Sequence, residues 1–226
     1  MSSRKEEKER LKREREERER AAAAKARRSR LLQLIGGVVV ACAIVAGVAY
    51  AVSTGGGAGD DDDAQIDTEK LKAAAQDSGC VYRSFPNEGQ DHVTGPLTAD
   101  DFKTNPPTSG AHNPEPAPDG LYVPGNEPAI ENWVHTLEHG RIIFQYRPGV
   151  DRSVVAQLEK LFNEDVGDSD GGYHSLLMRN NTNMPFEVAA VAWRHYMACR
   201  EFTPEAISAL RTFREELVDQ APEKVP

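Results

Sequence analysis

The stretch Trp133–Arg147, WVHTLEHGRIIFQYR, joins the densest chemistry of the chain to its clearest structural signal. Its first half carries two histidines four positions apart, with a glutamate between them. Its second half, after Gly140, is a short apolar run that is typical of a buried strand. Because glycine commonly follows the last residue of a helix, we expect a short helical turn that feeds directly into a strand over 141–147.

The sequence after this strand alternates helical and strand patterns. Asp151 is a good N-cap, and Pro204 favours the first turn of a helix. Apolar periodicity predicts a helix, two strands and a final helix over 152–164, 174–179, 187–197 and 204–219. The order β-α-β-β-α in the last third predicts an α+β domain with a small mixed or antiparallel sheet.

The sequence before the strand has the composition of a long ordered loop. Residues 84–129 are rich in Pro, Gly, Asn and Asp, and one part of them, Asn105–His112 (NPPTSGAH), ends in a histidine. A loop of this length in a compact domain is usually functional or disordered, and its aromatic residues and histidines favour a function. A short helix is expected farther upstream, over 68–77.

The charge is distributed very unevenly. Residues 1–30 carry thirteen Lys/Arg and seven Glu, residues 31–53 carry no charge, and the rest of the chain is acidic. A helix over 31–53 is long enough to span a bilayer, and the basic flank before it places the N-terminus in the cytoplasm. We therefore predict a single-pass signal anchor in the cell membrane. An acidic domain argues against nucleic acid as a partner.

Two other interpretations of the apolar segment fit less well. A signal-peptidase site at Ala49–Ala51 would follow an apolar run and a charged leader that are both too long. A lipid anchor on Cys42 would leave ten further apolar residues after it. The predicted organisation is a charged cytoplasmic segment, a transmembrane anchor, an acidic linker with a short helix, and an extracytoplasmic domain, over 1–30, 31–53, 54–78 and 79–226.

Cys80 and Cys199 are the two cysteines outside the apolar segment. In an oxidising compartment such a pair is most simply a disulfide, and its long loop predicts a stabilisation of about 4 kcal/mol. A redox or metal-binding thiol pair is the alternative, but the CxxC spacing typical of such pairs is missing.

The histidines suggest a metal site. His135, Glu138 and His139 match the H-x-x-E-H zinc signature, although Gly140 leaves no room for the long helices of such proteases. A looser interpretation adds His112, since three neutral imidazoles with an open position suit zinc or copper. The competing interpretation is a buried hydrogen-bonded network with Glu138 as acceptor.

Other residues have both a functional and a structural interpretation. The sulfurs of Met178, Met184 and Met197 could favour copper, but methionine at strand positions commonly fills the core. Ser109 could pair with His112 as a nucleophile, but no acid partner is evident and turn chemistry explains Thr108–Gly110. His174 and His195 are expected to be surface or hydrogen-bonded core residues.

Three motifs in this order, Asn105–His112, Val134–Gly140 and Ala192–Trp193, resemble the bacterial domain of unknown function 3105 (DUF3105). The resemblance covers about residues 79–226. It implies a single-pass anchored protein with one ectodomain and singles out the same three histidines and Glu138, but it implies no activity. Ala111 stands where the family pattern has proline, and Arg141 where it has a small residue.

We therefore expect a membrane-anchored extracytoplasmic protein that binds zinc or copper through His112, His135 and His139. One alternative is a non-catalytic module whose Pro-rich loop, with Tyr122 and Trp133, docks an envelope protein or a cell-wall component. A second alternative is a metal-dependent hydrolase with Glu138 as the base, although the sequence favours a protein that is not an enzyme.

Overall fold

The computed structural model describes residues 66–225. The described residues belong to one compact unit with bounds at 60 and 226, and they contain two hydrophobic clusters, so this unit is expected to fold by itself. In the described part of the chain no helix is long and apolar enough to cross a membrane. The predicted anchor over 31–53 and the charged segment over 1–30 lie outside the described residues.

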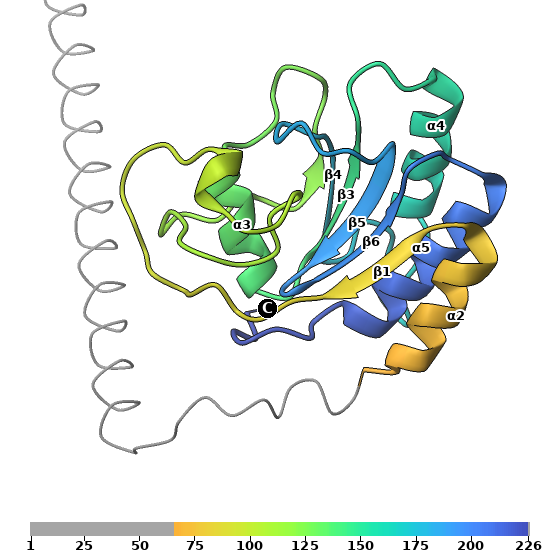
Figure 1. The fold of residues 1–226 in the computed structure, drawn as a ribbon, viewed down its shortest axis with the longest axis horizontal. Helices are drawn as coiled ribbons and strands as arrows, with labels where there is room; N and C mark the ends of the chain where they lie inside the picture. Colours follow the sequence, from red (N-terminus) through yellow and green to blue (C-terminus); the bar gives the residue numbers. More distant parts are fainter. Residues whose placement is uncertain (1–65, 226) are drawn as a thin grey trace, which may run out of the picture. The chain divides into compact units, whose positions relative to one another are not determined.

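Six strands form one mixed sheet in the order β1-β6-β5-β3-β4-β2 (Figure 1). They are β1 Val81–Ser84, β2 Gly120–Leu121, β3 Ile142–Tyr146, β4 Ser175–Arg179, β5 Val188–Ala192 and β6 His195–Cys199. β3 and β2 both run parallel to β4, which lies between them, whereas β1, β6, β5 and β3 pair antiparallel. Together with the helices, this sheet confirms the predicted α+β class.

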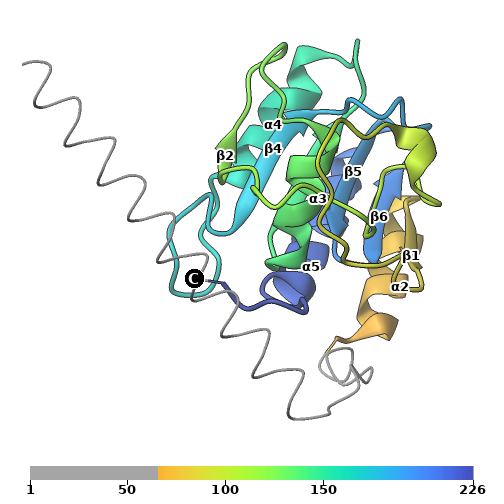
Figure 2. The same cartoon turned by 90° about the vertical axis from the view of Figure 1, so that its left-hand side faces the viewer.

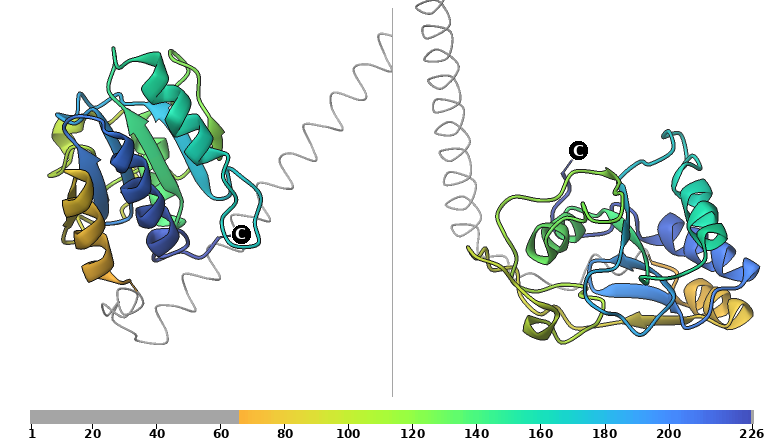
Figure 3. Two further views of the ribbon diagram at one scale, coloured as in Figure 1. Left: turned by 90° about the vertical axis from the view of Figure 1, so that its right-hand side faces the viewer. Right: turned by 90° about the horizontal axis from the view of Figure 1, so that it is seen from above.

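Three helices cover one face of the sheet (Figure 3). They are α2 Thr68–Ser78, α4 Arg152–Phe162 and α5 Pro204–Leu217. Alternate β3 residues, Ile142 and Phe144 among them, point to this side, where they pack with Leu158 of α4 and Phe213 of α5. We call this side the helical face. The Asp151 cap is present, since its side chain accepts from the Ser153 backbone N–H at 2.7 Å.

The other face of the sheet is covered by α3 Ile130–Glu138 and by the Pro/Gly-rich chain before it (Figure 2). We call it the loop face. Ile143 of β3 points to this side, and Trp133 and Leu137 of α3 pack on it. The segment 85–129 is ordered over the sheet with only the short η2 Ala99–Asp101 and β2 as regular structure.

The structure corrects two predicted elements and adds two strands. The single strand over 187–197 is two strands, β5 and β6, joined by a tight turn in which Arg194 has a φ of 65°. No glycine or proline marks this turn, and the Arg194 backbone N–H donates to Thr108 of the loop instead. The helical turn before Gly140 is a nine-residue helix, α3, and the strands β1 and β2 were not predicted.

The disulfide between Cys80 and Cys199 is present, as predicted. It links the residue before β1 to the last residue of β6, and both cysteines are buried in the cluster of the helical face. The bond therefore ties the start of the domain to the interior of its sheet.

Candidate metal centre

Helix α3 positions the chemistry of the H-x-x-E-H motif. Its apolar residues pack on the sheet, while His135 and Glu138, three residues apart, share the side that faces the Pro/Gly-rich loop. Gly140 ends the helix with a φ of 80°. A Cβ there would stand 2.8 Å from the Asp219 Cα, so this position needs glycine for its backbone conformation and for space.

The loop supplies two further histidines. The segments of His92 and His112 pair as a short parallel bridge, in which the Val93 backbone N–H donates to the His112 carbonyl at 2.8 Å. The His92 and His135 rings are stacked with centroids 5.0 Å apart, and the His112 ring lies 4.7 Å from that of His135. Two segments of the loop therefore bring the imidazoles of His92 and His112 against one side of α3.

These contacts create a group of four candidate ligands, which we call the inner group. Its members are His92, His112, His135 and Glu138, and one ligand atom of each lies within 4.8 Å of those of the others. His92 is exposed and the other three are buried. Three imidazole nitrogens and a carboxylate oxygen form a donor set that suits zinc or copper.

The hydrogen bonds of the buried histidines leave one lone pair on each neutral ring. His112 Nδ1 lies 2.8 Å from the Gly110 carbonyl oxygen, and His135 Nδ1 lies 2.6 Å from that of Asn113. Because a carbonyl oxygen only accepts, both Nδ1 atoms carry the proton, and each neutral ring has its lone pair on Nε2. Backbone carbonyls orient metal-binding histidines in this way. The lone pair of His135 accepts a hydrogen bond from His139 Nε2 at 2.9 Å, which an ion would have to replace.

One of these nitrogens lacks a hydrogen-bond partner. His112 is fully buried, and its Nε2 lies 2.9 Å from Glu138 Oε2, but the two atoms are not aligned for a hydrogen bond. In the described residues this Nε2 therefore has no such partner. A lone pair that faces a carboxylate is repelled unless a proton or a cation lies between them. A proton on His112 Nε2 or a metal cation between the two groups would therefore fit this geometry.

A second set of groups, the outer group, shares His135. The His139 Nε2 lies 2.9 Å from His135 Nε2 and 3.3 Å from Glu223 Oε2. The Glu223 backbone N–H donates to the Glu138 carbonyl at 3.1 Å, so the last residues of the chain dock on the end of α3. Arg141 also holds this tail through the Val225 carbonyl. The predicted ligands are thus divided between two groups that share His135.

Burial and neighbouring charges shift the pKa values of these side chains. Burial lowers the pKa of His135, with a smaller contribution from the nearby histidines, and burial also lowers the pKa of His139. Burial opposes charge on His112 too, but Glu138 and the Gly110 carbonyl outweigh it and raise the pKa of His112. The same pairing holds the pKa of Glu138 below its usual value despite burial. His135 and His139 are thus favoured as neutral ligands.

Several other residues weighed in the sequence have structural partners. The Ser109 Oγ accepts from the Glu88 backbone N–H at 3.0 Å, which fits a turn role. His174 pairs with Asp219, and His195 Nδ1 bonds the Tyr82 hydroxyl. The methionines 178, 184 and 197 are buried in the two hydrophobic clusters, as core residues are.

Sequence reasoning missed His92 and Glu223. His92 lies in the loop whose composition suggested a function, twenty residues before His112, and the scarcity of histidine in the chain was the one signal that could have drawn attention to it. Nothing in the sequence distinguishes Glu223 from the many other acidic residues, since only the docking of the tail brings it to His139.

Comparison with known proteins gives a family and no activity. A family model described as "Protein of unknown function (DUF3105)" matches residues 92–225, which is more than half of the chain. The match begins at His92 and includes every member of both groups. Searches of curated proteins and of solved structures found no significant match. The chain therefore belongs to the DUF3105 family.

Proposed function

We propose that the domain binds one zinc or copper ion through His92, His112, His135 and Glu138. The two buried histidines supply Nε2 lone pairs, the carboxylate offsets the charge of the ion, and the exposed His92 completes the site from the solvent side. His139 and Glu223 lie next to His135 and provide further donors beside the site.

The observation that carries this proposal is the buried His112 Nε2. The ring donates through Nδ1 to Gly110, and its Nε2 lies 2.9 Å from the Glu138 carboxylate without an aligned hydrogen bond in the described residues. Buried polar atoms are normally satisfied, because an unsatisfied one costs about 1–3 kcal/mol. A bound cation would satisfy the imidazole and the carboxylate together.

Metal binding can be measured on the unit 60–226 after treatment with a chelator. We expect one Zn²⁺ or Cu²⁺ per chain by elemental analysis after loading and desalting. His112→Ala and His135→Ala should each weaken binding by about a hundredfold, because each removes one of two buried nitrogens. His195→Gln, at a histidine outside both groups, is the matched control and should leave binding unchanged.

Two results would contradict the proposal. One is a loaded wild-type protein that holds far less than one ion per chain. The other is metal affinity that is the same in His112→Ala, His135→Ala and the wild type. His92→Ala separates the two groups, since it should weaken binding if the ion lies in the inner group, whereas Glu223→Gln should weaken it more if the ion lies in the outer group.

We propose that the domain acts outside the cytoplasm, held by an anchor over 31–53. The uncharged segment, its basic flank and the Cys80–Cys199 disulfide support this location, because disulfides persist in oxidising compartments. Protease added to intact spheroplasts should digest the domain but protect a tag at the N-terminus. Protection of the domain until the membrane is lysed would contradict this topology.

The alternatives for this site have less support. Trp133 is fully buried and its indole N–H donates to Asn181, so it cannot dock a partner without unfolding of the loop face. Glu138 is buried against His112, which suits a ligand or a charge-balancing group better than the base of a hydrolase. Metal binding without hydrolysis is therefore the function that these residues support best.

A further inference from the structure

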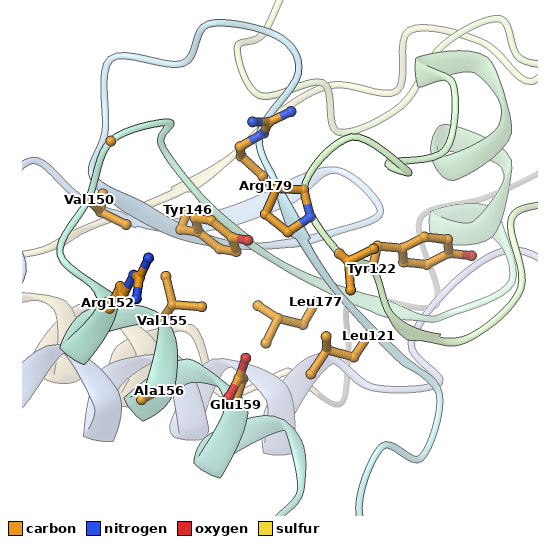
Figure 4. A pocket seen from close by; sticks show the side chains of 13 residues that line it. Leu121, Tyr122, Tyr146, Val150, Arg152, Val155, Ala156, Glu159, Leu177 and Arg179 are labelled. Atoms are coloured by element: carbon orange, nitrogen blue, oxygen red, sulfur yellow. The ribbon is translucent and has the colours of Figure 1, made fainter.

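A second site lies away from the histidines, between β2, the ends of β3 and β4, and helix α4. It is a pocket of about 450 Å³, within the range of small-molecule sites, and Figure 4 shows its lining. None of its lining residues belongs to either histidine group. The floor and walls are mainly apolar and include Leu121, Val155 and Leu177.

The pocket occupies the position in the fold where parallel sheets usually bind ligands. β2 and β3 lie on either side of β4 and run parallel to it. The last residue of each of these three strands lines the pocket, namely Leu121, Tyr146 and Arg179. Arg152, the first residue of α4, lines it as well. Ligands of open α/β sheets bind outside the carboxyl ends of parallel strands, where loops rather than strands fill the space.

Tyr146 offers the pocket a hydroxyl that has no hydrogen-bond partner within the described residues and is still reached by solvent. Tyr146 is only 6% exposed, and its hydroxyl makes no hydrogen bond within residues 66–225. Figure 4 shows this hydroxyl directed toward the middle of the lining residues. Burial raises the pKa of Tyr146, so the phenol keeps its proton and can donate it in a hydrogen bond.

The charges around the pocket define which ligand fits. Arg179 is paired with Glu127 at 2.8 Å, whereas Arg152 has no ion-pair partner in the part of the chain that the structure describes. Glu159 lines the pocket farther along α4 and repels acid groups from its own side. A ligand with one acid group would therefore place it at Arg152.

We propose that this pocket binds a small amphipathic organic anion. Its apolar body packs on Leu121, Val155 and Leu177. Its acid group pairs with Arg152 and accepts a hydrogen bond from the Tyr146 hydroxyl. This binding needs no metal and is independent of the histidine groups.

The proposal can be tested with two probes that share their rings and differ in one charge. The metal-free unit 60–226 is titrated with 8-anilinonaphthalene-1-sulfonate, which carries a sulfonate, and with uncharged N-phenyl-1-naphthylamine. We expect saturable fluorescence with one site for each probe. Arg152→Gln should weaken binding of the sulfonate about tenfold and leave the uncharged probe unaffected, because a charge-assisted hydrogen bond is lost. Tyr146→Phe should weaken the sulfonate about fivefold.

Matched variants locate the binding. Ala156→Trp adds bulk at an exposed α4 position on the pocket and should abolish binding of both probes, whereas Lys160→Trp, on α4 outside the lining, should not. Arg83→Gln removes an exposed arginine on β1 and should leave the sulfonate unaffected. Cooperative melting of each variant shows that it is folded. If folded Ala156→Trp binds both probes as the wild type does, the pocket is not the binding site. If Arg152→Gln weakens binding of both probes equally, the ligand is not recognised by its negative charge.

Discussion

The two faces of the sheet are built by opposite means. Three amphipathic helices cover the helical face, and their apolar stripes are visible in the sequence. The loop face is covered by α3 and by a Pro/Gly-rich chain, whose hydrogen bonds go to distant segments. Both faces bury a hydrophobic cluster, and the members of both histidine groups lie on or beside the loop face. Rigid regular structure thus supports a face on which irregular chain can orient side chains.

The largest expected effect is a loss of stability on the helical face that leaves metal binding on the loop face intact. Phe213→Ala on the helical face should lower the free energy of unfolding by about 3–5 kcal/mol, since it empties a fully buried aromatic position. Below its melting temperature the variant should still bind one metal ion. Denaturant melts and metal titration of the same sample check both parts, and loss of metal by the folded variant would show that the faces are coupled.

The second prediction concerns the effect of metal binding on the stability of the domain. Metal at a hundred times its dissociation constant should raise the free energy of unfolding by about 2.7 kcal/mol, because the ion binds the native state alone. Hydrogen exchange should slow most in α3 and in residues 85–129, which carry the ligands. Equal slowing in α2, which contributes no ligand to either group, would contradict a site confined to the loop face.

The third prediction tests the end of α3. Gly140→Ala should lower the free energy of unfolding by about 1–3 kcal/mol, because alanine is strained at a φ of 80° and its Cβ would meet the Asp219 backbone. It should also displace the tail that carries Glu223. Gly149→Ala, at a positive φ of 86° with open space around the added Cβ, is the control for the strain alone.

The smallest effect concerns an ion pair on the helical face. Arg211 lowers the pKa of Glu164 through two hydrogen bonds of 2.6 and 2.7 Å. A lowered folded-state pKa adds stability above the unfolded pKa near 4.5, and this stability is lost as the pH falls through the folded value. In Glu164→Gln the free energy of unfolding should therefore fall less steeply as the pH decreases through the acid range. Because the Glu164 side chain is 36% exposed, we expect the substitution to lower the free energy of unfolding at pH 7 by less than about 1 kcal/mol.

The comparison also explains which elements were predictable. The helices α4 and α5 and the strands β3 and β4 are encoded by local periodicity, and their ends lie within two residues of the predicted bounds. The turn between β5 and β6 was missed because Arg194 is held in a left-handed conformation by bonds from its backbone to Thr108 and from its side chain to Phe85. Local sequence patterns do not predict hydrogen bonds between residues that are far apart in the chain.

Residue type and short spacing were enough to predict the α+β class, the disulfide between Cys80 and Cys199 and the end of α3 at Gly140, and to select three histidines as candidate ligands. Which side chains come into contact follows from the folding of distant segments against one another. His92 joins His112 through a parallel bridge, and Glu223 reaches His139 by docking of the tail. The pocket at the strand ends also forms only when β2, β3 and β4 align. Such contacts depend on chain segments far apart in sequence, and a linear pattern cannot specify their register.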